Sequence, residues 1–154
     1  MTGPATILPE GTDKVGYGGA GRVAVVYERT GPGRAAIREA AELAGAGREL
    51  WVVTLAPQVL AARWGRAGGE GPYNVAMREE AEIELKEARE LLGSLAGRAT
   101  FTMLAGRPQP PLVKWVGENG LKLVLLPRHR FTPGGNRYAK GLRAETEAEV
   151  RLIG

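Results

Sequence analysis

The alternation of hydrophobic and polar stretches predicts the secondary structure over most of this chain. Short apolar or alternating runs rich in β-branched residues are typical of strands that are buried in a parallel sheet. Five such runs occur, at residues 22–28, 49–56, 98–105, 121–126 and 149–153. The segments between them carry apolar residues at helical spacing and predict helices at 33–46, 73–95, 108–119 and 137–146.

The helix expected at 73–95 has the clearest pattern. Its apolar positions form one stripe, which consists of Met77, Ala81, Leu85, Ala88, Leu92 and Leu95. The opposite face is charged, with Glu82 and Lys86 at an i,i+4 spacing that favours an ion pair. Residues 78–90 hold six Glu against three basic residues, and we interpret this acidic excess as a solvated helix surface.

The order of these elements predicts the fold class. Strands that alternate with helices favour an α/β fold with an open, mostly parallel five-stranded sheet and helices on both faces. The length of 154 residues suits one domain, which we place at residues 22–154. Residues 1–21 hold six glycines and two prolines and are expected to form an irregular N-terminal arm. Residues 58–72, which include Trp64, are expected to form a loop.

The absence of cysteine narrows the classes of function. It excludes disulfides, thiolate metal sites and cysteine nucleophiles, and it favours a cytoplasmic location. No apolar run is long enough to span a bilayer and no secretory signal pattern begins the chain, so we expect no membrane partner. The single histidine, His129, and the single serine, Ser94, have no catalytic partners nearby in the sequence, so we expect neither an enzyme nor a metal site.

In an open parallel sheet, ligands bind beyond the carboxyl ends of the strands, where the strand order reverses. This rule directs attention to residues 27–30, 54–57 and 127–141. The last segment is basic, because residues 119–144 hold six Lys or Arg and no acidic residue, within a chain of net charge +4.

Two interpretations of this basic loop stay open. Arg128, Arg130, Arg137 and Lys140, with glycines between them, could surround a small phosphate-bearing ligand by charge. The simpler interpretation is a solvated loop. We do not expect nucleic acid, because the loop offers few rings on which bases could stack.

Several segments also follow one another in a specific order. They are RVAVVYE from residue 22, ELWVVTLA from 49, TFTMLAGRP from 100, PPLVKWVGENG from 110 and LKLVLLP from 121. This ordered set resembles the universal stress protein family over about residues 22–154. The resemblance implies an adenine nucleotide alpha hydrolase-like, Rossmann-like fold and a role in the stress response.

In family members that bind ATP, an acidic residue ends the first strand and a glycine-rich loop after the fourth lets backbone N–H groups approach the phosphates. The resemblance places the equivalent positions at Tyr27, Glu28, Thr54, Leu126, Pro127, Arg128, Arg130, Lys140 and Gly141. Three features depart from the pattern: Pro127 has no N–H to donate, Arg130 replaces a glycine, and Gly141 is out of register and followed by Leu142 in place of Ser or Thr. We therefore expect no cofactor and no efficient binding of ATP or AMP.

The resemblance also implies a homodimer, because family members commonly pair their last strands across a two-fold axis. Here that strand is Glu149–Ile153, which would present an apolar edge. We therefore expect a homodimeric regulatory or binding module that is not an enzyme. The alternative is a protein that binds ATP, AMP or another phosphate-bearing ligand through the altered basic loop at 127–141.

Overall fold

The computed structural model describes residues 21–58, 70–106, 110–129 and 137–154. Nearly all of the predicted N-terminal arm, most of the predicted loop at 58–72, and Arg130 lie outside the described residues. In chain order, the described elements are β1 (Arg22–Val26), α1 (Gly31–Gly45), β2 (Leu50–Pro57), α2 (Glu70–Leu92), a 3₁₀ helix (Gly93–Arg98), β3 (Ala99–Gly106), α3 (Leu112–Glu118), β4 (Leu121–Pro127), α4 (Arg137–Glu145) and β5 (Glu149–Ile153).

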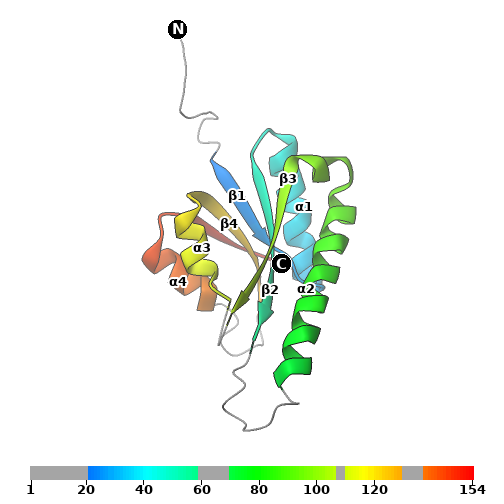
Figure 1. Ribbon diagram of the computed structural model, residues 1–154. Coiled ribbons are helices and arrows are strands. Elements are labelled where there is room, and N and C mark those ends of the chain that lie inside the picture. The colour runs from blue at the N-terminus through cyan, green and yellow to red at the C-terminus, as the bar shows by residue number, and fades with distance from the viewer. Residues whose placement is uncertain (1–20, 59–69, 107–109, 130–136) are drawn as a thin grey trace.

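The strands form one open sheet in the order β3-β2-β1-β4-β5, and every neighbouring pair is parallel. α1 and α2 cover one face of the sheet, and α3 and α4 cover the other (Figure 1). Each face has its own hydrophobic core. The predicted α/β fold, with an open five-stranded parallel sheet between helices, is therefore confirmed.

β1 is the central strand and is buried on both faces, as its continuous apolar run predicts. Val23 and Val25 pack into the core with α1, whereas Ala24 and Val26 pack into the core with α3 and α4. All four side chains are at most 3% exposed. From Val23 to Val26 the strand therefore offers no side chain for binding, so functional groups at its carboxyl end must come from the segment that follows it.

The strand order reverses at β1. From β1 the chain adds β2 and β3 on one side, and then crosses over to add β4 and β5 on the other side. The carboxyl ends of β1 and β4 are therefore neighbours, with Val25 paired with Leu125. This is the switch point at which open α/β sheets bind their ligands.

α2 differs from the predicted helix at both ends. It starts within the predicted loop at 58–72, and it stops at Leu92 because Gly93 adopts a φ of 58°, a left-handed conformation that ends an α-helix. The prediction that the helix continues to Leu95 is therefore wrong. The apolar stripe is confirmed where it meets the sheet, since Ala81 and Ala88 are buried. Neither α2 nor any other helix in the described part is both long and apolar enough to cross a bilayer.

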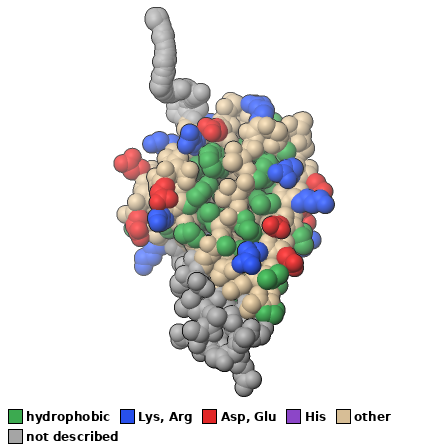
Figure 2. Space-filling model, viewed as in Figure 1, with side chains coloured by type: hydrophobic (Ala, Val, Ile, Leu, Met, Phe, Trp, Pro, Cys, Tyr) green, Lys and Arg blue, Asp and Glu red, His purple; other side chains and the backbone are tan. Residues whose placement is uncertain are grey.

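Hydrophobic side chains gather between α3 and α2, where β2 and β3 cross the face of the molecule (Figure 2). Trp51 of β2 and Trp115 of α3 meet there edge to face, with ring centroids 5.6 Å apart. The guanidinium of Arg22 lies 5.9 Å from the centre of the Trp51 ring. This aromatic pair anchors α3 to β2.

α1 begins close against the end of β1, and this contact requires glycine at position 33. A Cβ atom at Gly33 would lie 2.0 Å from the carbonyl oxygen of Glu28, a backbone atom that cannot rotate away. We therefore expect Gly33→Ala to lower the free energy of unfolding by about 3 kcal/mol or more, as measured by chemical denaturation. Gly31→Ala is the matched control, because a Cβ there would meet nothing within 4 Å. Equal losses of stability in the two variants would contradict this prediction.

Candidate functional site at the switch point

The turn between β1 and α1 holds the carboxylate of Glu28 in place. Thr30 is the N-cap of α1, and its hydroxyl oxygen accepts the N–H of Gly33 at 3.0 Å, as capping residues do. The same hydroxyl donates to Oε2 of Glu28 at 2.9 Å. Glu28 is therefore oriented by the start of the helix that follows it.

A second partner reaches Glu28 from the neighbouring strand. His129, which follows β4, places its Nε2 2.7 Å from Oε2 of Glu28. The two residues are 101 positions apart in the sequence and lie after the ends of β1 and β4, on either side of the switch point. The side chain of His129 is 32% exposed and that of Glu28 27% exposed, so solvent reaches both members of the pair.

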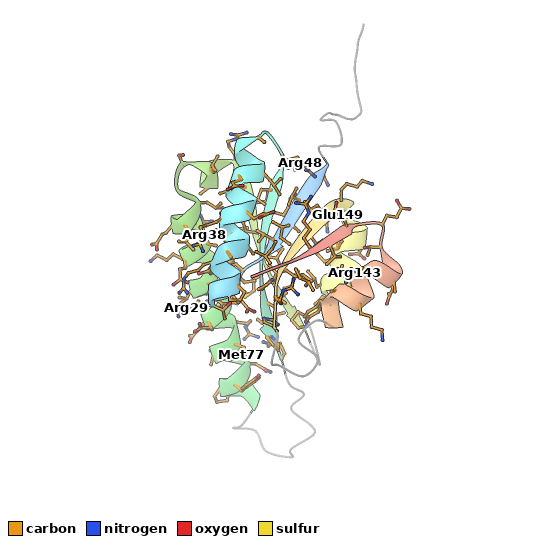
Figure 3. All side chains as sticks on the ribbon, turned by 180° about the vertical axis from the view of Figure 1, so that it is seen from behind. Arg29, Arg38, Arg48, Met77, Arg143 and Glu149 are labelled. Carbon is orange, nitrogen blue, oxygen red and sulfur yellow. The ribbon has the colours of Figure 1, made fainter. Side chains whose placement is uncertain are left out.

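Three glutamates of α2, Glu80, Glu84 and Glu87, form what we call the α2 acidic cluster. The side chain of Arg29 pairs with Glu80 and with Glu87, each at 3.2 Å, and its backbone N–H donates to Glu84 at 3.1 Å. The phenol of Tyr27 donates to Glu87. The turn after β1 is therefore tied to α2 as well, and Figure 3 shows Arg29 beside that helix.

The surroundings change the proton affinity of several groups in this cluster. Burial raises the pKa of Glu84 from 4.5 to about 7; the N–H of Arg29 opposes this shift, and the carboxylate of Glu80 adds to it. Burial and then the bond to Glu87 raise the pKa of Tyr27 to about 12. The same bond lowers the pKa of Glu87. Glu87 is therefore an ionised partner of Arg29 at neutral pH, whereas Glu84 titrates near pH 7.

No family model matches this sequence, and no curated protein matches it. Solved structures do. A universal stress protein family member from Burkholderia pseudomallei matches with a TM-score of 0.65 at 18% identity, over 86% of this chain and 94% of that chain. UspA from Lactobacillus plantarum matches with a TM-score of 0.68 at 12% identity, over 88% of this chain and 98% of that chain. The universal stress protein from Archaeoglobus fulgidus in complex with dAMP matches with a TM-score of 0.60 at 20% identity, over 86% of this chain and 96% of that chain. This is the universal stress protein fold.

The universal stress protein fold brings some of the predicted site residues together. Those that lie after or at the ends of β1 and β4 are Tyr27, Glu28, Pro127 and Arg128. Tyr27 bonds to α2 and Glu28 to His129. Pro127 is buried and ends β4. The Nη2 of Arg128 turns to β5, where it donates to the carbonyl oxygen of Leu152 at 3.4 Å.

The other predicted residues lie elsewhere in the universal stress protein fold. Thr54 is fully buried and donates its hydroxyl to the carbonyl oxygen of Ala81 at 3.0 Å, so it fastens β2 to α2. Leu126 belongs to the core with α3 and α4. Lys140 is exposed on α4, and Gly141 packs so closely on α3 that a Cβ there would lie 3.1 Å from Val113. Arg130 lies outside the described residues.

Sequence reasoning missed the roles of His129 and of the α2 acidic cluster. The partner of His129 is remote in sequence, so no local pattern signals the pair. The α2 acidic cluster left a signal, because Glu80, Glu84 and Glu87 follow i, i+4, i+7 spacing and therefore share one helix face. The interpretation of the acidic excess as simple solvation is wrong for these three residues.

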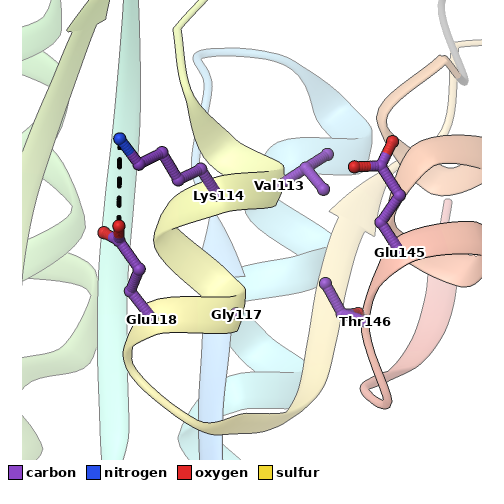
Figure 4. A pocket seen from close by; sticks show the side chains of 6 residues that line it. All are labelled: Val113, Lys114, Gly117, Glu118, Glu145 and Thr146. Carbon is purple, nitrogen blue, oxygen red and sulfur yellow. Dashed lines mark ion pairs between the residues drawn. The ribbon is translucent and has the colours of Figure 1, made fainter.

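A hollow of about 490 Å³ lies between α3 and α4 (Figure 4). Its lining consists of Val113, Lys114, Gly117, Glu118, Glu145 and Thr146. Lys114 and Glu118 lie one turn apart on α3 and pair with each other at 3.9 Å. This hollow shares no residue with the switch point, and in the described part of the chain no three His, Asp or Glu gather to hold a metal ion.

From the raised pKa of Glu84 we predict how the free energy of unfolding changes with pH. The native state keeps the proton of Glu84 up to about pH 7, whereas the unfolded chain releases it near 4.5. Between pH 4.5 and about pH 7 the native state therefore binds more protons than the unfolded chain. The free energy of unfolding falls as the pH rises through this range, because the stability that the protonated Glu84 contributes is lost. Glu84→Gln cannot ionise and its amide oxygen can still accept the Arg29 N–H, so we expect this variant to be more stable than the wild type at pH 8.

The measurement is chemical denaturation of both proteins between pH 4 and pH 8. The advantage of Glu84→Gln should grow as the pH rises and should be smallest at the acid end. Glu82→Gln removes an exposed carboxylate from the same helix and controls for the loss of one negative charge. An advantage that does not change with pH would show that the burial of Glu84 is not its cause.

Proposed function

We propose that this chain is a universal stress protein that acts as a regulatory binding module and does not bind ATP efficiently. The observation that carries this proposal is the pair between Glu28 and His129, which spans the switch point at 2.7 Å. In an open α/β sheet, this is where a nucleotide would enter. Here the two side chains bind each other at that place.

Among the described residues, the backbone at the ends of β1 and β4 also offers few donors to a phosphate group. Phosphate sites in such folds use N–H groups at a helix N-terminus or in a glycine-rich loop. In the first turn of α1, Pro32 has no N–H and the N–H of Gly33 is taken by Thr30. Pro127 at the end of β4 has no N–H either.

The charges on the β1 and α2 side of the switch point are unfavourable for an anion as well. An entering triphosphate would meet the carboxylate of Glu28 and the α2 acidic cluster, and like charges repel. Arg29 is already paired with two of these glutamates. Both the donors and the charges therefore support a module without efficient ATP binding.

We also propose that this module is not an enzyme. A histidine paired with a carboxylate can act as a general base when a nucleophile lies beside it. The chain has no cysteine, and its single serine, Ser94, lies in the 3₁₀ helix that follows α2. The hydroxyl of Thr30, which does touch Glu28, serves as the helix cap.

A second candidate is a nucleotide-binding module that uses the altered basic loop at 127–141. Its support is the universal stress protein from Archaeoglobus fulgidus, whose structure was solved in complex with dAMP. In this alternative the arginines of the loop bind the phosphate by charge instead of through backbone N–H groups.

A thermal-shift experiment tests the first candidate against the second. We expect 1 mM ATP, AMP, dAMP or cAMP to leave the melting temperature unchanged relative to matched salt. A site with a dissociation constant of about 10 μM would stabilise the protein by about 2.7 kcal/mol under this condition, which is a shift of several degrees for a domain of this size. A saturable shift that Arg130→Ala abolishes would instead establish the second candidate.

We further propose that the protein forms a homodimer through β5. β5 is an edge strand of the sheet, and its Leu152 and Ile153 are only partly buried. Unpaired strand edges with apolar side chains favour pairing with a second copy. Light scattering after size exclusion should then give a mass that rises with concentration above the 16.4 kDa of the monomer. A mass that stays at the monomer value up to the highest attainable concentration would refute the dimer.

A further inference from the structure

The outer edge of β5 can be derived from its hydrogen bonds to β4. The N–H of Arg128 donates to the carbonyl oxygen of Ile153 at 2.9 Å, so the backbone groups of Ile153 face β4. Successive residues of a strand direct their backbone groups to opposite sides. Val150 and Leu152 therefore direct their N–H and C=O groups away from β4, and these are the groups to which a further strand would bond.

Both of these outward carbonyl groups already have a donor within the chain. Nη2 of Arg143, on α4, lies 3.3 Å from the carbonyl oxygen of Val150. Nη2 of Arg128, which follows β4, lies 3.4 Å from the carbonyl oxygen of Leu152. Figure 3 shows Arg143 on α4, beside β5. Two guanidinium groups from different elements therefore cover one short strand edge.

The position of the Arg128 side chain lowers stability through one unpaired donor, so its contact with β5 is kept against an energetic penalty. Its Nε is buried and has no hydrogen-bond partner among the described residues. A buried donor without an acceptor is unfavourable and uncommon in folded proteins. The side chain of Arg128 nevertheless extends from the end of β4 to β5, where its Nη2 contacts the carbonyl oxygen of Leu152.

Strand pairing at this edge would have to displace both arginines. The N–H groups of an incoming strand need the carbonyl oxygens of Val150 and Leu152, to which the guanidinium groups now donate. In a two-fold dimer, Arg128 and Arg143 of both copies would also crowd against one interface, and like charges repel. Charged side chains on edge strands are a common way in which proteins limit edge-to-edge association.

At the opposite edge of the sheet, the described residues do not show this arrangement. β3 runs from Ala99 to Gly106 and contains no charged residue. The guanidinium of Arg89 lies 4.3 Å from the ring centre of Phe101, and so contacts a side chain of β3 rather than its strand edge. Within the described residues, the arginine cover is therefore found at β5 and not at β3.

We propose that Arg128 and Arg143 act as a gate on β5: they hold its outward carbonyl groups and keep the dimer weak and reversible. This inference rests on the proposed homodimer, whose strength it explains. A second copy of this chain is the partner, and release of the two guanidinium groups is the step that pairing requires.

The test compares dimer dissociation constants by sedimentation equilibrium. In Arg128→Ala/Arg143→Ala, we expect the constant to fall at least about tenfold, which corresponds to about 1.4 kcal/mol. Arg38→Ala/Arg98→Ala is the matched control, because it removes the same charge from exposed positions on α1 and the 3₁₀ helix; its constant should stay near that of the wild type. Circular dichroism checks folding, and Arg143→Ala alone, at an exposed position, provides a milder variant that should shift the constant in the same direction.

A further substitution tests whether the tighter dimerisation of the double variant occurs at β5. Leu152→Pro removes an outward N–H and leaves the groups that face β4 intact, so adding it to the double variant should return the dissociation constant to the wild-type value or above. If the triple variant still dimerises more tightly than the wild type, the gate is overturned, because association then uses another surface such as β3. A wild-type dimer whose constant is unchanged in the double variant overturns the gate but leaves the dimer standing. If both proteins stay monomeric, the dimer and the gate both fail.

Discussion

The burial of β1 on both faces and both sides is the constraint on which the rest of this structure depends. Its four central side chains are at most 3% exposed, which requires a strand on each side and helices above and below. To supply them, the chain must build outward from β1 in both directions, and this reverses the strand order. The switch point between β1 and β4 therefore follows from the requirement to bury one apolar strand.

The described polar groups at the switch point bond to one another. Thr30 caps α1 and orients Glu28, and His129 meets Glu28 from the other strand. The same turn is held from α2 by glutamates that converge on Arg29. Polar groups that in related folds could serve a ligand are thus used here to join the ends of β1, β4 and α2. These contacts are the physical basis of our proposal that this universal stress protein fold does not bind ATP efficiently.

Arg128 links the switch point to the edge of the sheet. It follows β4 directly, so its backbone continues the ladder to β5 while its side chain reaches a carbonyl group on the outer side of the same strand. Because β4 and β5 are adjacent, a residue that follows β4 can reach the hydrogen-bonding groups at the outer edge of the sheet while the strand order and register stay the same. In this chain the carboxyl end of β4 and the outer edge of β5 therefore share the contacts of one residue, Arg128.

The sequence by itself determined the strands, the helices and their order, because apolar periodicity and β-branched content are local properties. It also determined that Pro127 cannot donate an N–H to a phosphate. Only the tertiary structure decided that Glu28 meets His129 across 101 positions, that Arg29 binds three glutamates of α2, and that Thr54 serves packing through Ala81. It also decided which arginines cover β5. These contacts join elements that are distant in the chain, and the direction of a side chain toward a remote partner is set by how the layers pack, which no local pattern encodes.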